Sequence, residues 1–519
     1  MGEAHGWLFE LTFNRSVKLR QADPRITSDA GALLLREVDH RLALTADLAA
    51  GLYDRRDPAL IRYTHTELLR QHLYGLALGY AHQDDQDVLA QDVGMKLAVW
   101  DRPGPAVINE RLGSQPSDWR LVDRLSDQRR VLNEALPVWV GRHQRAAGAG
   151  RKVQSGTLDI DPFPIAVHGR QQGGAYHGHY GQTMYYPLVA SFSAGGDYDG
   201  PRLGEGYVHA MLRRGNAGGA EGAARFVREA IRKARPLACG LDVRIDAGLV
   251  EPKVLDAIDE EGVCFVGRLK NNAVLDKLAQ PLLYRPPGRP SKAGEEFAVD
   301  VGVYQAQSWQ RPYRLVLVVT DLPDAKTGLR ALFPHYFFLV TNWSAGHKGA
   351  WELLEHYRKR GTFEDRFGEF NAVIGPHLPA ESFAANETAL LLKLLAFNLA
   401  GMIRGELEAA TAPAASTSSN PAKTGGADLA AAAKSGWDLG RVQQTVLKVG
   451  ARVVEHSRRI FVDVAAAAGV LWGKLLAGLD GWWLDQAWGR DAAGKRRGPR
   501  PRQWVPPPAH AHLHLVLRQ

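Results

Sequence analysis

The order of strand and helix signals between residues 151 and 272 is the feature that most restricts the fold. Runs of apolar and β-branched residues predict five strands, and two amphipathic stretches predict helices between the later ones. The strands are expected at Thr157–Asp161, Met184–Ser193, Tyr207–Leu212, Leu241–Asp246 and Val263–Leu269, and the helices at Ala220–Lys233 and Lys253–Glu260. Three closely spaced strands can form a meander, and strands that alternate with helices align in parallel. The pattern therefore predicts an α/β sheet.

The regions on either side differ in composition. Residues 1–150 are expected to be mainly helical, with a helix over His65–Tyr80 and another over Ala30–Val38 that has Ser28 as its N-cap. The stretch 273–335 is rich in Pro, Gly and β-formers, which predicts a strand-rich insertion between the two parts of the sheet region, 151–272 and 336–410.

The second part of the sheet region is expected to carry two long helices, Gly349–Phe370 and Ala385–Ala409. Residues 411–436 are of low complexity and predict a flexible linker. The C-terminal segment, 437–519, is expected to form a helix near Val442–Ala468 and to end in a basic, Pro-rich tail.

Composition excludes several classes of protein. Two cysteines cannot form a disulfide scaffold and favour a reducing cytoplasm. The N-terminus has no basic stretch followed by an apolar one, so no signal peptide is expected. The most apolar run, Thr388–Ile403, is short for a bilayer span and contains Lys393, which argues against a membrane partner. The net charge of +8 is compatible with a polyanionic partner.

Three acidic residues lie where this order of elements would bring them together. Asp161 ends the first predicted strand, Asp246 ends the fourth, and Glu364 lies on the helix that follows the insertion. Carboxylates suit Mg²⁺, and two such ions can stabilise the attacking and leaving oxygens of an in-line phosphoryl displacement. Asp159 and Asp242 face the same side of their strands as Asp161 and Asp246, so each remains an alternative ligand.

The helix after the insertion places further polar residues beside Glu364. At about 100° per residue, Tyr357, Arg360, Glu364 and Asn371 fall within an arc of about 60°. An arginine beside a carboxylate suits a site that binds both metal and phosphate, because its guanidinium is a fork-shaped phosphate donor.

The spacing Tyr357-x2-Arg360-x3-Glu364-x6-Asn371 closely resembles the Y-x2-R-x3-E-x6-K signature of bacterial insertion-sequence transposases, which have a DDE site on an RNase H-like fold. Further stretches resemble the insertion-sequence family numbered thirteen-eighty, in order from about residue 25 to about 405. They are RITSDAGALLLREVD, DRRDP, LLRQHLYGLALGY, LDID with the following VHGRQQGGAYHGHYGQTMYYPLVA, VRIDAG, and LPAESFAANETALLLKLLAFNLA.

The resemblance implies a role for each matching residue. Asp161, Asp246 and Glu364 would be the DDE metal ligands, which favours Asp161 over Asp159, while Tyr357 and Arg360 would support the site and the DNA backbone. Two departures are present. Pro162-Phe163 replaces the small hydroxyl residues that usually follow the first acid, and Asn371 replaces the family's lysine at a DNA-phosphate contact.

The fold implied is α/β: an RNase H-like core with a strand-rich insertion, preceded by a mainly helical N-terminal region. The function implied is that of a cut-and-paste transposase, which binds the terminal inverted repeats of its element and cleaves and transfers strands with two Mg²⁺ ions, or with Mn²⁺ in their place. Its partners would be double-stranded DNA, both the element ends and the target, and a second copy that pairs the two ends. Residues 1–150 would supply end recognition, and the protein would work at the bacterial nucleoid in the cytoplasm.

Other interpretations remain open at this level. Trp309, in the insertion, either stacks on an unpaired base near the cut site or is a buried sheet residue. The chain as a whole is either a transposase, another RNase H-like nuclease, or a non-catalytic DNA-binding protein derived from a transposase. Terminal repeats beside the gene and the effect of Asp246→Ala on binding and cleavage discriminate these three.

Overall fold

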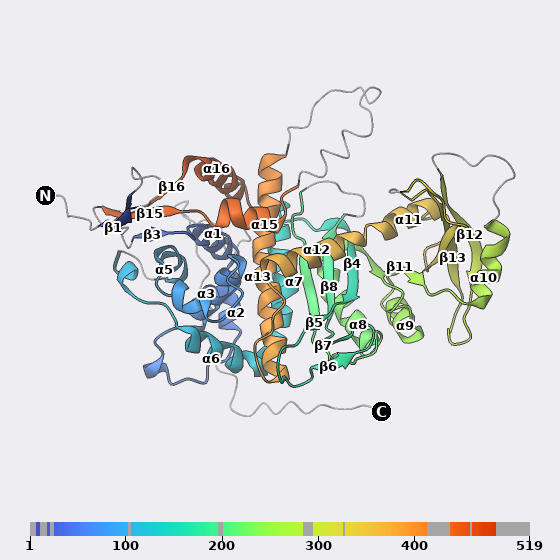
Figure 1. Ribbon diagram of the computed structural model, residues 1–519, viewed down its shortest axis with the longest axis horizontal. Helices are drawn as coiled ribbons and strands as arrows, with labels where there is room; N and C mark the ends of the chain where they lie inside the picture. The colour runs from blue at the N-terminus through green and yellow to red at the C-terminus, as the bar shows by residue number, and fades with distance from the viewer. Residues whose placement is uncertain are drawn as a thin grey trace, which may run out of the picture.

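The computed structural model describes residues 7–10, 18–20, 25–101, 105–195, 201–283, 294–324, 327–412, 436–456 and 459–483. Nearly all of the predicted linker and the whole basic tail lie outside these residues. Figure 1 shows a helical part, a central long helix and a large sheet arranged along the longest axis of the molecule.

Helices dominate the described chain up to residue 147. They are α1 (Ala32–Leu42), α2 (Leu44–Ala50), α3 (His65–Ala77), α4 (Asp85–Leu89), α5 (Val93–Val99), α6 (Gln115–Leu125) and α7 (Arg129–Ala147), with 3-10 turns at Pro58–Leu60, Pro105–Asn109 and Ser126–Gln128. Three short strands precede them: β1 (Trp7–Glu10), β2 (Lys18–Arg20) and β3 (Ile26–Thr27).

The beginnings of two of these helices can be compared with the predictions for His65–Tyr80 and for the Ser28 cap. α3 begins where expected, because Thr64 and Glu67 form a reciprocal capping box at its N-terminus. The prediction that Ser28 caps α1 is wrong: the cap is Gly31, and the Ser28 hydroxyl bonds Asp29 instead. Hydrogen bonds from the backbone of Ala30 and Gly31 to the carbonyls of Val449 and Leu447 tie this segment to the C-terminal part of the chain.

A mixed sheet of eight strands forms the other half of the molecule. Its strands are β4 (Val153–Pro162), β8 (Leu188–Ala194), β9 (Gly206–Met211), β10 (Ala238–Ile245), β11 (Cys264–Leu269), β12 (Glu295–Tyr304), β13 (Tyr313–Asp321) and β14 (His335–Thr341). The order across the sheet is β12-β13-β14-β11-β10-β4-β8-β9. β10 runs parallel to both β4 and β11, and the other pairs are antiparallel.

Four of the five predicted strands form much as expected, and one is divided. The predicted strand Met184–Ser193 becomes β7 (Gln182–Tyr185) and β8, with Pro187 between them. Because proline has no backbone N–H to donate to a ladder, it separates two strands here. β7 joins a small sheet with β5 (Ile165–Ala166) and β6 (Ala175–His177).

The predicted insertion is continuous with the sheet. β14 pairs with β11 in register Val266↔Thr341 to Leu269↔Phe338, and β13 and β12 follow outward from β14. The expectation of a strand-rich stretch is confirmed, but these strands widen the sheet. The segment also contains α10 (Ala273–Ala279) and a 3-10 turn at Gln280–Leu282.

Helices cover both faces of the sheet, as the burial of successive residues of β8 requires. Leu188, Ala190 and Phe192 pack into one cluster with α8 (Ala223–Ala234) and α9 (Pro252–Glu260), with the 3-10 turn Arg235–Leu237 beside them. Val189 belongs to the other cluster, which is formed by helices of the N-terminal region, among them α1, α3 and α7, together with helices of the second half of the chain. Each strand can contribute to both faces because successive side chains point in opposite directions.

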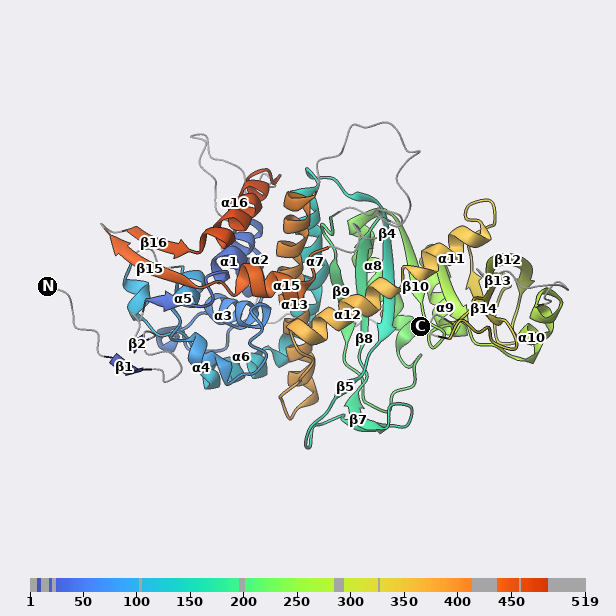
Figure 2. The ribbon, with the colours of Figure 1, turned by 45° about the horizontal axis from the view of Figure 1, so that its top comes forward.

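The predicted continuous helix Gly349–Phe370 is wrong, because the chain forms two helices, α11 (Ala350–Arg358) and α12 (Gly361–Val373). They meet at Lys359–Arg360, where hydrogen bonds span three residues rather than four, as from the Phe363 amide to the Arg360 carbonyl. Figures 1 and 2 show α12 crossing beside the sheet to reach α13 (Phe383–Thr411).

α13 is the central helix of the molecule. With 29 residues and a mean hydropathy of 1.3 over its most apolar stretch, it is long and apolar enough to cross a membrane. The expectation that the apolar run Thr388–Ile403 is short for a bilayer span therefore does not apply to the whole helix. That stretch is wholly buried inside the protein, packed against α1, α3, α7 and β9 among others. A core helix that is apolar on all sides accounts for these properties.

The end of the described chain returns to the N-terminal part. It comprises α15 (Leu439–Val442), a π-helical turn (Gln443–Leu447), β15 (Ala451–His456), β16 (Arg459–Val464) and α16 (Ala466–Asp480). The predicted helix Val442–Ala468 is therefore wrong over most of its length. β15 pairs with both β16 and β3, so tertiary pairing stabilises a strand here.

Candidate active site

Asp161 and Asp246 lie at the same edge of the sheet. β4 and β10 run parallel in a register that pairs Ile160 with Ile245. Asp161 directly follows Ile160, and Asp246 directly follows Ile245. Asp161 is 9% exposed, and Asp246 is half-buried. Parallel strands with this register bring two carboxylates that are far apart in sequence next to each other.

The turn after β10 holds the Asp246 carboxylate. Its Oδ1 accepts hydrogen bonds from the backbone amides of Gly248 and Leu249, both at 3.0 Å. Gly248 leaves room for this carboxylate, because a Cβ there would lie 3.3 Å from both carboxylate oxygens and would require a small shift of the Asp246 side chain. Burial raises the pKa of Asp246 above its usual value, although these two amides and the Lys270 ammonium oppose the rise. Asp246 is thus a carboxylate whose negative charge is only partly compensated.

Arg360 connects Asp161 with Glu364. Its guanidinium forms an ion pair with the Asp161 carboxylate, and its Nη1 lies 3.3 Å from Glu364 Oε1. Burial lowers the pKa of Arg360, while Glu364 and Asp159 raise it. The Glu364 side chain is 70% exposed. The guanidinium occupies the position of a cation between the first and third acids.

The acids Asp159 and Asp242, each an alternative ligand by sequence, are engaged elsewhere. Asp159 forms a two-pronged ion pair with Arg244, with both N–O distances at 2.7 Å and both side chains buried. Asp242 Oδ1 lies 2.9 Å from Nε2 of the buried His356. Arg244 also donates to the His356 carbonyl at 3.0 Å, so the two pairs together fasten α11 to the sheet.

Tyr357 lies at the end of α11, close to the acids. Its side chain is half-buried, and burial raises the pKa of its phenol to about 12. The negative charges of Asp246 and Glu364 add to the rise, and Arg268 opposes it. The phenol is therefore protonated at neutral pH and is available as a hydrogen-bond donor beside the carboxylates.

Phe163 explains one departure from the sequence signature. Its ring is 2% exposed and packs against Phe367 and Phe370 of α12, with centroids 4.2 Å and 6.1 Å away. The residue after Pro162 thus anchors the Glu364-bearing helix over β4. Sequence reasoning overlooked Phe163, Arg244 and His356 as positioning residues. The only signals were that Phe163 and Arg244 each lie two positions from a candidate acid and that His356 directly precedes Tyr357.

The two remaining predicted residues lie apart from these contacts. Asn371 is exposed on the last turn of α12. Trp309 is 7% exposed and packs edge-on against Tyr304 and Tyr313, with centroids 5.5 Å and 5.4 Å away. The buried alternative for Trp309 is the one observed, because its ring faces neighbouring aromatic side chains and is not available to stack on a base.

The residues present fit a divalent cation by their chemistry. Carboxylate oxygens are the ligands that Mg²⁺ prefers, and a guanidinium already stands between Asp161 and Glu364 as a substitute cation. Among the residues that the structure describes, no three His, Cys, Asp or Glu side chains converge closely enough to hold a metal. Binding would therefore require Arg360 to leave and Glu364 to approach.

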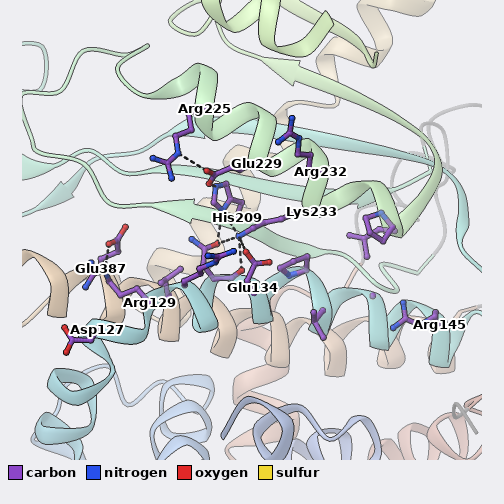
Figure 3. Close-up of a pocket in the computed structure, with 18 residues that line it drawn as sticks. Asp127, Arg129, Glu134, Arg145, His209, Arg225, Glu229, Arg232, Lys233 and Glu387 are labelled. Carbon is purple, nitrogen blue, oxygen red and sulfur yellow. Dashed lines mark hydrogen bonds and ion pairs between the residues drawn. The ribbon is translucent and has the colours of Figure 1, made fainter. Parts of the chain in front are cut away.

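A cleft of about 950 Å³ between α7 and α8 is separate from the acids and is lined by none of them. Figure 3 shows its charged residues paired with one another, including Arg225 with Glu229 and Lys233 with Glu134. Burial lowers the pKa of His209, on the cleft wall, to about 2, so its imidazole is neutral. The ionic groups here largely satisfy each other.

Comparison with known proteins gives a family match over most of the chain. The family described as "Transposase DDE domain group 1" matches residues 9–419. No curated protein matches the chain. Among solved structures, a cryo-EM structure of the piggyBac transposase synaptic complex with hairpin DNA is similar, with a TM-score of 0.37 and 13% identity over 72% of this chain and 74% of that chain. Similarity at that level supports no conclusion about function.

Proposed function

This chain belongs to the family of transposases with a DDE domain of group 1, and we propose that it is the transposase of a bacterial insertion sequence. The family match spans the helical region, the sheet and α13. Within that family, the quoted motifs favour the insertion-sequence group numbered thirteen-eighty. The observation that carries the proposal is the meeting of Asp161, Asp246 and the Arg360–Glu364 pair at one edge of the sheet.

The proposed catalytic core is RNase H-like. The strand order β9-β8-β4-β10-β11, with β8 and β9 antiparallel to their neighbours and β4, β10 and β11 parallel, supports it. The first acid ends the central strand, and the second ends the strand beside it. This arrangement presents both carboxylates beyond the carboxyl ends of parallel strands, where ligands commonly bind in open α/β sheets.

Asp161, Asp246 and Glu364 would hold two Mg²⁺ ions, with Mn²⁺ as a substitute. Bound there, the ions would supply positive charge to the attacking and leaving oxygens of a phosphodiester during in-line displacement. Arg360 would exchange its two carboxylate partners for a DNA phosphate, which its fork of N–H donors suits. Tyr357, protonated at neutral pH, would donate a hydrogen bond beside the acids and so orient the DNA backbone.

The proposed reaction is cut-and-paste transposition. The protein would bind the terminal inverted repeats of its element, hydrolyse a phosphodiester there, and direct the freed 3′-hydroxyl at target DNA. Because two ends must be joined, two copies would act together as a homodimer. The helical region 1–150 would contribute end recognition and contacts between copies, and the reaction would take place at the nucleoid in the cytoplasm.

A cleavage assay on labelled DNA from the gene's own flanks tests this proposal. It compares the wild type with Asp246→Ala and Glu364→Gln, in Mg²⁺ or Mn²⁺. Asp365→Asn serves as the matched control, because Asp365 is an exposed acid adjacent to Glu364 on α12. We expect metal-dependent cuts at a repeat boundary from the wild type and the control, and none from the other two variants.

Two results would contradict the transposase proposal. Tight binding to the flanks without cleavage by any form would identify a non-catalytic DNA-binding protein. Cleavage of random or branched DNA, with neither binding nor cutting at the element ends, would identify a general nuclease.

A further inference from the structure

A cluster of histidine and lysine side chains lies at the far end of α12 from Glu364. We propose that His82, His168 and His377, backed by the buried Lys393, form a binding site for a backbone phosphate of DNA. The site lies outside the acidic centre, and the proposal rests on the proposed function. This site would hold the DNA duplex at a point a few nucleotides away from the acidic centre.

Lys393 is the least expected member of the cluster. It lies in the middle of the apolar helix α13, its side chain is 3% exposed, and burial lowers its pKa to about 8. The only hydrogen bond of its ammonium among the described residues is a long one, 3.4 Å to the carbonyl of Ile374 at the C-terminal end of α12. An ammonium has three donors, so this group retains capacity for an anion.

Two loops converge on the segment that follows Ile374. Gly375 has a φ of +78°, and a Cβ on it would lie 3.2 Å from the Cβ of Ala81, which adjoins His82. The loop that carries His168 is fastened to the same segment, because Gln171 Nε2 donates to the Leu378 carbonyl at 2.7 Å. These contacts hold the histidines of two loops beside His377.

The rings themselves lie close together. The His377 centroid is 5.9 Å from that of His82 and 6.3 Å from that of His168. Burial lowers the pKa of His377, and the charges of Lys393, His82 and His168 lower it further. No carboxylate contributes to that shift in the pKa of His377. The acids nearest to His82 along the chain are Asp84 and Asp85, and the Asp85 carboxylate accepts a hydrogen bond from the backbone amide of His82 at 3.1 Å.

The three neighbouring imidazoles and the buried Lys393 ammonium together favour a phosphate as the ligand. His82 and His168 are exposed and His377 is half-buried, so solvent reaches the imidazoles while Lys393 lies beneath them. An oxyanion would accept hydrogen bonds from the imidazole N–H groups and would offset the positive charge of the Lys393 ammonium. A phosphate is the one anion that repeats along the proposed substrate.

The position relative to Glu364 suits a continuous duplex. α12 rises about 14 Å from Glu364 to Val373, and His377 follows in the next loop. At about 3.4 Å per nucleotide along one strand, this distance corresponds to roughly four phosphates. A strand cut at the acids would therefore reach the cluster without a large bend.

Binding of a fluorescent duplex from the element end, measured by anisotropy in EDTA, tests the site. The test variant combines His82→Gln, His168→Gln and His377→Gln, all at accessible positions, and a second variant is Lys393→Met alone. The matched control is His335→Gln, an exposed histidine on β14. Titrations from about 50 to about 200 mM salt give the number of phosphates contacted.

We expect the triple variant to bind about tenfold more weakly and to lose about one unit of the salt slope, with Lys393→Met changed in the same direction. His335→Gln should match the wild type. Wild-type affinity and slope in both test variants would overturn the phosphate site while leaving the proposed function intact. Failure of the wild type itself to bind the element end would overturn the proposed function, and this site with it.

Discussion

Arg360 and Asp161, which are 199 positions apart in the chain, form an ion pair at the carboxyl end of β4. The same guanidinium contacts Glu364 one turn along α12. Arg360 thus contacts two of the three carboxylates that we assign to metal binding and offsets part of their negative charge. It joins the first half of the sheet to a helix that lies beyond the whole of the β12–β14 segment.

Replacement of Arg360 should strengthen metal binding. Because its guanidinium and a divalent cation would occupy the same side of Asp161 and Glu364, Arg360→Gln is expected to raise Mn²⁺ affinity by about tenfold, or about 1.4 kcal/mol. Isothermal titration of the DNA-free protein measures it. Arg358→Gln is the matched control, since Arg358 pairs with Glu296 and Glu355 instead. Equal affinity in all three forms would contradict the competition.

The raised pKa of Asp246 predicts how metal binding depends on pH. Metal requires the ionised carboxylate, so affinity should fall as pH falls through a value above the ordinary 3.8. Mn²⁺ titrations at successive pH values, with Asp246→Asn for comparison, measure this loss. A decline that begins only below the ordinary range would contradict it.

The ionised carboxylate of Asp246, which metal binding requires, should destabilise the folded protein when no metal is bound. A folded-state pKa above the unfolded value means that burial penalises the charged form, at a cost that is present above the raised pKa and is relieved as pH falls through it. Asp246→Asn is therefore expected to raise the melting temperature at pH 7 while it abolishes cleavage. A lower melting temperature than that of the wild type would show that the charge is compensated.

The Asp159–Arg244 pair should stabilise the fold rather than take part in chemistry. Arg244→Met leaves a buried carboxylate without its partner and should cost about 3–5 kcal/mol of unfolding free energy. The double variant Asp159→Leu/Arg244→Met removes both charges and should recover most of that loss. Denaturant titration measures both, and equal losses in the two variants would indicate that the pair contributes by packing alone.

Lys393→Met should stabilise the protein at neutral pH. The pKa of Lys393 is about 8 in the folded state against 10.5 as its ordinary value, so the penalty on the charged form is full below pH 8 and disappears above 10.5. The difference corresponds to roughly 3 kcal/mol at pH 7. Melting curves at pH 7 and near pH 10.5 should show a gain at the first and little at the second. A gain of the same size at both would exclude the charge as its cause.

Trp309→Ala should reduce stability and leave DNA binding unchanged. Removal of a buried tryptophan costs about 3–5 kcal/mol through lost contacts and the cavity left behind. Anisotropy with a single-stranded extension at the element end, measured well below the melting temperature, gives the binding comparison. Loss of affinity in a variant that remains folded would restore base stacking as the role of this residue.

Local patterns were sufficient for the elements that build the core. Apolar runs predicted β4, β9, β10 and β11, and the helical spacing of apolar residues predicted α3, whose N-terminus is fixed by a capping box. These elements succeed because burial of an apolar face and satisfaction of terminal amides depend on residues close together in sequence. The same reasoning placed Asp161 and Asp246 at strand ends.

Elements that depend on distant partners were predicted poorly. β15 and β16 pair with each other, and β15 also pairs with β3 from the N-terminal part. The predicted insertion continues the sheet through β14 and β11. The helix break at Lys359–Arg360 likewise coincides with the attachment of Arg360 to Asp161. The local sequence of these segments does not indicate which distant segment each of them contacts.

The sequence by itself therefore determined the strand and helix order, the acids at the strand ends and the spacing of Tyr357, Arg360 and Glu364 on their segment. Only the tertiary structure decided that Asp159 and Asp242 are paired with Arg244 and His356, whereas Asp161 faces Arg360. The physical reason is that side-chain alternation fixes which face of a strand a residue occupies, but the charge that it meets there comes from a segment between 85 and 199 positions away.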